Sequence, residues 1–287
     1  MLKNFILRGK ILSPLFIEQY KRGIFGKKQT PEYILPKGIK RGSRDHLHFI
    51  TVCAPLSYVR NADELHKIAK KTFEDPKTRF LFYPKAVLKK TVPQVYEALE
   101  RHGLGKRIHR ETSSFIIPLS KNLVYLHDGD PYNLLAHYKF DALKIYEAMR
   151  NKFSDWFPYI SGVKVICFYL REIASLGFPF KLKNLDKINI PVDIHVLRAT
   201  IRLGCITGKY EGPIEEMNNV VRAYWKEVCE GEQFFPLQLD QPLWLLSRGG
   251  CKLSKESYCP KEKMCYFARF CRSGIFEKSS DYVKIDT

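Results

Sequence analysis

From residue 46 onward, apolar side chains recur every three or four positions along the chain. This spacing places apolar residues on one face of a helix, so it predicts helices that each bury one face. The predicted helices cover residues 49–59, 62–71, 93–100, 141–151, 163–175, 192–203, 213–229 and 239–248. The pattern therefore predicts an all-α protein made of two helical lobes.

Several ends of these helices carry their own signals. We expect Asn61 to be an N-cap, because acidic residues follow it in the first turn and lysines end the helix. The stretch Leu176-Gly177-Phe178-Pro179 is expected to end the helix over 163–175. Between Ser113 and Asp128 the alternation is less regular, and we expect a loop or a short pair of strands there.

The pattern divides the chain into four parts. Residues 1–45 hold 11 Lys and Arg against 3 Asp and Glu, together with several Gly and Pro. We expect a short helix or two and then a basic arm, which packs on the C-terminal lobe and either follows phosphates or is simply solvated. Residues 46–175 are expected to form a helical-barrel lobe that ends in a hairpin. Residues 176–250 would form the second helical lobe, and residues 251–287 a cysteine-rich loop and tail.

Charge and composition narrow the function classes. The 287 residues include 48 Lys and Arg against 30 Asp and Glu, a net charge of +18, and 45% are hydrophobic, which excludes a wholly disordered chain. No apolar run is long enough for a membrane span, and the first residues are unlike a signal peptide, so we expect an intracellular protein. Such an excess of positive charge points to nucleic acid, or else only to a soluble basic surface.

Four of the eight cysteines lie within one short segment near the C-terminus, with the spacing C-x7-C-x5-C-x5-C. These cysteines are Cys251, Cys259, Cys265 and Cys271. Without a secretion signal, this density favours a metal centre over disulfides. The wide gaps fit a [4Fe–4S] cluster better than a zinc ion, which usually takes closer cysteine pairs. Zinc and the absence of any metal remain the alternatives, and the other four cysteines are expected to be small buried residues.

Two polar residues stand out near the middle of the chain. Gly162 lies in a tight turn before an apolar helix, and Lys164 is the first polar residue of that helix, so we expect it near the interface of the lobes. Asp193 begins the next long helix, after Pro191. Read alone, such a lysine is usually a solvated surface group and such an aspartate usually an N-cap.

Together, the segments Gly162-Val163-Lys164-Val165 and Pro191-Val192-Asp193-Ile194-His195 resemble the helix-hairpin-helix DNA glycosylase superfamily. The similarity is closest to the archaeal 8-oxoguanine DNA glycosylase/AP lyase family. It covers roughly residues 155–250, extends by helix order over 46–154, and is absent from 1–45. The four-cysteine loop is similar to that of endonuclease III and the adenine glycosylase, although its gaps differ from theirs.

The resemblance implies roles for particular residues. Lys164 would be the nucleophile, Asp193 the carboxylate beside it in one pocket, and His195 a residue that supports the DNA backbone. The phosphate-binding hairpin would consist of Ser161, Gly162 and Val163. One departure concerns phosphate binding, because Ile160 stands where the family has the first glycine of the hairpin.

The implied function is base-excision repair of double-stranded DNA that contains a damaged base. A DNA N-glycosylase with AP lyase activity would flip out an oxidised purine, such as 8-oxoguanine, and attack the sugar through a lysine Schiff base. Attack requires a neutral amine, so Lys164 should be partly desolvated. The alternatives are a non-catalytic nucleic-acid-binding protein of the same fold and a monofunctional glycosylase that uses Asp193 alone. We expect a monomer, and candidates for stacking on the extruded base are Trp156, Phe168, Tyr169 and Trp244.

Overall fold

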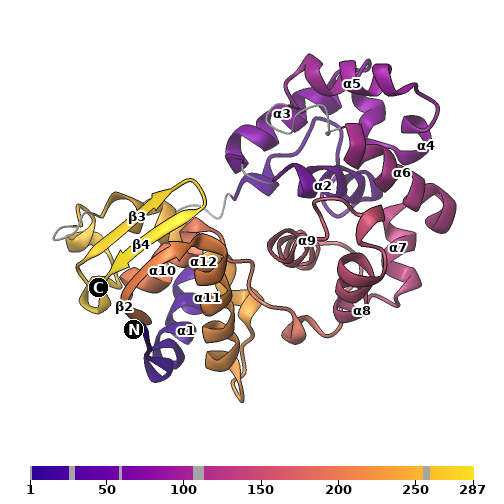
Figure 1. The fold of residues 1–287 in the computed structure, drawn as a ribbon. Helices are drawn as coiled ribbons and strands as arrows, with labels where there is room; N and C mark the ends of the chain where they lie inside the picture. The colour runs from indigo at the N-terminus through magenta and orange to yellow at the C-terminus, as the bar shows by residue number, and fades with distance from the viewer. Residues whose placement is uncertain (1, 26–29, 58–59, 106–112, 255–258) are drawn as a thin grey trace. The chain divides into compact units, whose positions relative to one another are not determined.

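A computed structural model describes residues 2–25, 30–57, 60–105, 113–254 and 259–287 (Figure 1). The chain forms two compact units. The terminal unit comprises Met1–Lys28 and Asn189–Thr287, and the central unit comprises Gln29–Ile188. The sequence pattern divides the chain after residues 45, 175 and 250, and these divisions stay a prediction. The first 28 residues and the stretch that follows them therefore contribute to different units.

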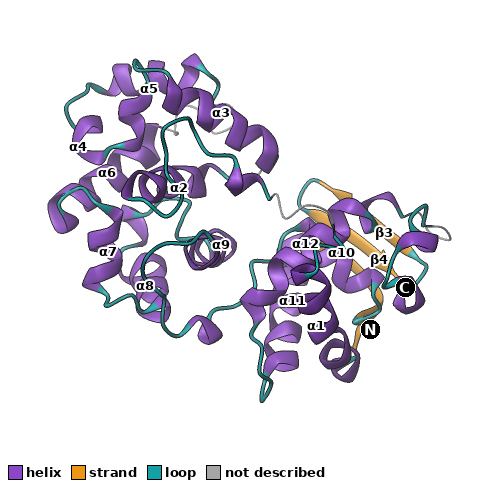
Figure 2. Ribbon diagram, turned by 180° about the vertical axis from the view of Figure 1, so that it is seen from behind, coloured by secondary structure: helices purple, strands orange, loops and turns teal. Residues whose placement is uncertain are grey.

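The central unit is built from helices (Figure 2). They are α2 (Arg44–Leu56), α3 (Ala62–Glu74), α4 (Pro84–Val87), α5 (Val92–Arg101), α6 (Ser113–His127), α7 (Pro131–His137), α8 (Ala142–Glu147) and α9 (Val163–Ser175). Helix α2 packs against α3, α7 and α9. Phe49 of α2 stacks on Phe82 at 5.3 Å between ring centroids, and Phe73 of α3 meets the same ring edge-on. This aromatic cluster forms part of the buried core of the unit.

The capping and periodicity signals in the sequence predict α3 correctly but miss α6. The side chain of Asn61 caps α3 by accepting a hydrogen bond from the backbone N–H of Glu64 at 3.1 Å, as predicted. Residues 113–127 form helix α6, so the expectation of a loop or strand pair there is wrong. The helix holds Pro118 in its interior and is apolar on much of its surface, which hides the helical period.

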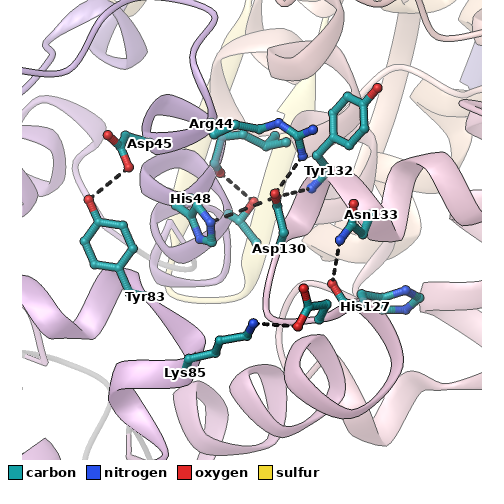
Figure 3. Close-up of polar contacts among 12 residues, drawn as sticks. Arg44, Asp45, His48, Tyr83, Lys85, His127, Asp130, Tyr132 and Asn133 are labelled. Atoms are coloured by element: carbon teal, nitrogen blue, oxygen red, sulfur yellow. Dashed lines mark hydrogen bonds and ion pairs between the residues drawn. The ribbon is translucent and has the colours of Figure 1, made fainter.

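A polar network joins α2, α4 and the start of α7 in the central unit (Figure 3). Asp130 caps α7 and accepts a hydrogen bond from Arg44 of α2 at 2.6 Å. His48, one turn further along α2, lies 3.9 Å from the same carboxylate. The hydroxyl of Tyr83, at the start of α4, donates to Asp45 at 3.0 Å. These bonds fix α2 against the helices around it.

The terminal unit combines helices with a small sheet (Figures 1 and 2). Its helices are α1 (Ile6–Lys21), α10 (Ile194–Arg202), α11 (Ile214–Cys229) and α12 (Asp240–Gly249). Its strands are β1 (Leu2–Asn4), β2 (Ile206–Pro213), β3 (Ile275–Ser279) and β4 (Tyr282–Asp286). The sheet has the order β1-β2-β4-β3, with antiparallel neighbours throughout. The protein is mostly helical as predicted, and the sheet is an addition that the sequence pattern did not indicate.

Helix α1 is part of the core of the terminal unit. Leu12 and Phe16 are fully buried there, in the same cluster as Trp225 of α11. Gly9 lets α1 approach α11 closely, since a Cβ at this position would lie 2.5 Å from the hydroxyl of Tyr224. In the part of the chain that the structure describes, no helix has the length and apolar character needed to cross a membrane.

Candidate active site

Asp193 lies at the start of α10 in the terminal unit, where it is the N-cap. Its Oδ1 accepts hydrogen bonds from the backbone N–H groups of His195 at 2.8 Å and Val196 at 2.9 Å. Its Oδ2 accepts a hydrogen bond from the indole Nε1 of Trp244 on α12 at 3.1 Å. The side chain is only half-buried, so this capping carboxylate is both fixed in place and accessible.

Positive side chains surround this end of α10. His195 contacts Ser247 through its Nδ1 at 3.3 Å, and its ring meets Trp244 edge-on at 5.4 Å. Burial lowers the pKa of His195, while the Asp193 carboxylate raises it and nearby cations, Arg248 among them, lower it. The guanidinium of Arg248 lies over the Trp244 ring, 4.9 Å from its centroid. A carboxylate among cations suits a site for a polyanion that reacts through a positively charged centre.

The predicted phosphate-binding turn lies at the start of α9 in the central unit. Gly162 is the N-cap and provides no capping side chain. The first backbone N–H groups of α9 therefore have no side-chain cap within the described residues, as at helix ends that bind anions. Tyr159 supplies the left-handed residue of the turn, with φ of 64°. Ile160 is fully buried, so the residue that replaces the expected glycine serves as a core anchor for the turn.

Lys164 lies in the first turn of α9, directly after this cap. Its side chain is half-buried, and its role as a nucleophile stays a prediction. Among the described residues, no salt bridge or hydrogen bond occupies its ammonium group.

Sequence reasoning missed a buried ion pair on the same helix. Arg171 of α9 pairs with Glu32, and both are nearly inaccessible. Burial opposes ionisation of Glu32, but the charge of Arg171 and several hydrogen bonds hold the pKa of Glu32 below its ordinary value. Phe168 lies under the guanidinium, 4.8 Å from it. No local signal could have paired two residues that are 139 positions apart.

The four aromatic candidates for base stacking differ in their exposure to solvent. Tyr169 is fully buried, and its hydroxyl bonds to Thr51 of α2 at 2.8 Å, so it is a core residue. Trp156 is 41% exposed, while Phe168 and Trp244 are half-buried. Only these last three have accessible ring surface in their own units.

The four C-terminal cysteines lie in the loop between α12 and β3, and all four are free thiols. Burial raises the pKa of Cys251, and the thiolates of Cys271, Cys265 and Cys259 raise it further. Burial and two of the same thiolates raise the pKa of Cys271 to about 11. The loop thus gathers the thiols close enough to repel one another when ionised. Within the described residues, however, no three His, Cys, Asp or Glu side chains are arranged as ligands of one metal ion.

Residues 167–275 match the model of the AGOG family, described as N-glycosylase/DNA lyase. The match covers 109 of the 287 residues, and over this segment the chain is similar to N-glycosylase/DNA lyases. The resemblance drawn from the sequence and the prediction of an enzyme are thereby confirmed. No curated protein matches the chain.

The matched segment contains some of the predicted site residues and not others. Asp193, His195 and the four cysteines lie within the matched residues. Lys164 lies three positions before them, and the adjoining hairpin residues 161–163 lie four to six positions before them. The structure brings Asp193 and His195 together at the start of α10, with Trp244 as the partner that sequence reasoning had considered only for stacking. Lys164 belongs to the central unit, where Gly162 places it at a helix start.

Proposed function

We propose that this chain is a bifunctional DNA glycosylase and AP lyase of base-excision repair. Its substrate would be double-stranded DNA that contains an oxidised purine, with 8-oxoguanine as the first choice. The observation that carries the proposal is the carboxylate of Asp193, fixed and accessible inside a domain of the N-glycosylase/DNA lyase family. A net charge of +18 fits a polyanionic substrate.

In the proposed reaction, Lys164 is the nucleophile. Its neutral amine attacks C1′ of the flipped nucleotide, and the glycosidic bond breaks, so that the base leaves with the electron pair of that bond and takes up a proton. Opening of the sugar gives a Schiff base between Nζ and C1′. Loss of a proton from C2′ then expels the 3′ phosphate and cleaves the strand. The half-buried position of Lys164 supports this role.

Asp193 would stabilise the positive charge that develops on the sugar as the base leaves. Its two backbone hydrogen bonds aim one oxygen into the helix start and leave the carboxylate at the surface of the unit. The start of α9 would bind a phosphate through its free backbone N–H groups, which requires no particular base sequence. His195 would support the DNA backbone beside Asp193.

Borohydride trapping tests the proposal. A duplex with one 8-oxoguanine is incubated with the protein and sodium borohydride, which reduces a Schiff base to a stable covalent bond. We expect a covalent complex with the natural protein and none with Lys164→Gln. Lys181→Gln is the matched control, because Lys181 is an exposed lysine of the same unit.

The other outcomes separate the alternatives. Excision without trapping would favour a monofunctional glycosylase that relies on Asp193. DNA binding without excision on 8-oxoguanine, other lesions or abasic sites would favour a non-catalytic binding protein. Trapping that persists in Lys164→Gln would assign the nucleophile to another amine.

We also propose that Cys251, Cys259, Cys265 and Cys271 bind a [4Fe–4S] cluster. The donor set supports it, since four thiols converge in one loop and their thiolates influence one another's pKa values. A cluster holds its ligands farther apart than one ion does, so its ligands need not meet the geometry of a mononuclear site. The cationic Arg198 acts on Cys251 and Arg202 on Cys271, which would offset the charge of a thiolate-bound cluster. Bound there, the cluster would hold the loop in place.

Metal analysis tests this second proposal. In protein purified without oxygen we expect about four iron atoms per chain and a broad absorption band in the visible range. Cys265→Ala should lose both, whereas Cys229→Ala, a cysteine of α11 outside the loop, should lose neither. Stoichiometric zinc without iron would show that the cysteines form a zinc site and not a cluster. The absence of both metals would refute the proposal of a metal centre.

A further inference from the structure

The second oxygen of the Asp193 carboxylate has a single described partner outside α10. Oδ1 is held by the backbone of His195 and Val196, whereas Oδ2 accepts its hydrogen bond from the indole of Trp244. The last torsion of an aspartate side chain is soft, so bonds to one oxygen alone leave the plane of the carboxylate free to turn. The bond from Trp244 therefore sets the direction of Oδ2.

The indole is itself held from several sides. Helices α10 and α12 pack against each other, which brings Trp244 to the start of α10. The His195 ring meets the indole edge-on at 5.4 Å, and the Arg248 guanidinium covers one face at 4.9 Å. Residues on either side of Trp244, Leu243 and Leu245, are buried in the core. Because the indole is already held in place, its N–H group can orient Oδ2 of Asp193 without any rearrangement during the reaction.

We infer that Trp244 is a positioning residue for base excision, whose indole N–H fixes Oδ2 of Asp193 toward the sugar. This inference rests on the proposed role of Asp193 and adds a residue through which that role is exerted. A stacking role for Trp244 would use the face of the ring, whereas positioning uses only the N–H group. The two roles can therefore be separated by a substitution that keeps the ring and removes the donor.

A double-mutant cycle carries out this separation. The variants are Trp244→Phe, Asp193→Asn and the two together, with Tyr282→Phe, which removes a donor from an exposed aromatic residue of the same unit, as the control. Each is assayed for the single-turnover rate of 8-oxoguanine excision and for affinity to a duplex with a stable abasic analogue. We expect Trp244→Phe to lower the rate between about tenfold and about a hundredfold, as misplacement of a reacting group does, with affinity unchanged. When Asp193→Asn is already present, adding Trp244→Phe should cause no further loss of the excision rate.

Each contrary result has a distinct meaning. An equal loss of rate from Trp244→Phe in both backgrounds would overturn the inference, because Trp244 would then act independently of Asp193. A loss confined to affinity would overturn it in favour of stacking or DNA contact. If Asp193→Asn itself excises normally, the proposed role of Asp193 fails, and the positioning role falls with it.

A spectroscopic test uses the intact protein and does not depend on the folding of the Trp244 variant. The chain has three tryptophans, so the indole ¹⁵N–¹H spectrum contains three resonances. Asp193→Asn replaces a charged acceptor by a neutral one, and we expect the Trp244 resonance alone to move upfield. Trp225, whose indole donates to Thr200 at 2.9 Å, is the internal control. An unmoved Trp244 resonance would show that the bond does not form in solution and would overturn the inference.

Discussion

His66 makes the stability of the central unit depend on pH. It lies on α3 with 3% of its surface exposed, and its Nδ1 has no hydrogen-bond partner among the described residues. Burial lowers the pKa of His66 to about 4; the carboxylates of Glu32 and Asp63 oppose this shift, and Arg171 adds to it. His66 is therefore protonated only near pH 4 in the folded protein, whereas the unfolded chain protonates it near pH 6.5.

The sign and size of the effect follow from this difference. Well above pH 6.5 the imidazole is neutral in both states, and its full contribution to stability is present. As the pH falls from about 6.5 to about 4, the unfolded state binds a proton that the folded state refuses, so the free energy of unfolding declines. A shift from 6.5 to about 4 makes the loss about 2 kcal/mol at pH 5 and about 3 kcal/mol at pH 4.

Urea unfolding followed by circular dichroism at pH 7 and pH 5 measures this loss. His46 and His127 also have pKa values lowered by burial to about 4, so the natural protein should lose more than His66 alone explains. His66→Gln cannot titrate, and we expect its loss between the two pH values to be smaller by about 2 kcal/mol. Each protein is compared with itself at the two pH values. Any destabilisation by the substitution that does not depend on pH therefore cancels.

His137→Gln is the control, because His137 is exposed. It should leave most of the decline in place. The reasoning is refuted if His66→Gln and the natural protein lose the same free energy of unfolding between pH 7 and pH 5.

Three further predictions concern stability and DNA binding. Arg171→Met should lower the free energy of unfolding by about 3–5 kcal/mol, because it leaves the buried Glu32 without its cation, and adding Glu32→Gln should restore part of the loss in urea titrations. Phe267→Ala should cost about 3–5 kcal/mol in the same assay, since the ring is fully buried against Phe16, and a cost below 1 kcal/mol would contradict that packing. DNA affinity should fall steeply with salt, and Lys252→Ala, beside the Asp193 site, should reduce the slope of log K against log salt by about 1 in anisotropy titrations; an unchanged slope would place Lys252 away from the DNA.

The sequence predicted elements whose signals are local. Helix α9 spans Val163–Ser175, as the apolar period between Gly162 and Gly177 predicted. The sheet was missed because its strands lack a period of two that stands out. Strand β1 has three residues, and β2 contains glycines and charged residues among its few apolar ones. These strands form because they pair with one another across the chain, which no window of sequence can show.

The same distinction applies to the candidate site. The position of Asp193 as the cap of α10 was readable from the residues around it. Its bond to Trp244, 51 positions away, was not, because it depends on how α10 and α12 pack. The sequence could likewise suggest several stacking aromatics, but only burial shows that Tyr169 belongs to the core.

Helix α10 connects the candidate catalytic carboxylate with the four-cysteine loop inside the terminal unit. Asp193 caps its first turn, and at its other end the carbonyl of Arg202 accepts a hydrogen bond from the backbone N–H of Arg272 at 2.7 Å. Burial lowers the pKa of Arg198 between them, while the thiolate of Cys251 and the carboxylate of Asp193 both raise it. One cation on the helix is therefore influenced by both groups. Ordering of the loop, by a cluster or by its own packing, acts on the helix that orients Asp193, so loss of the cysteines should impair excision through the geometry of α10 while the reacting groups themselves remain.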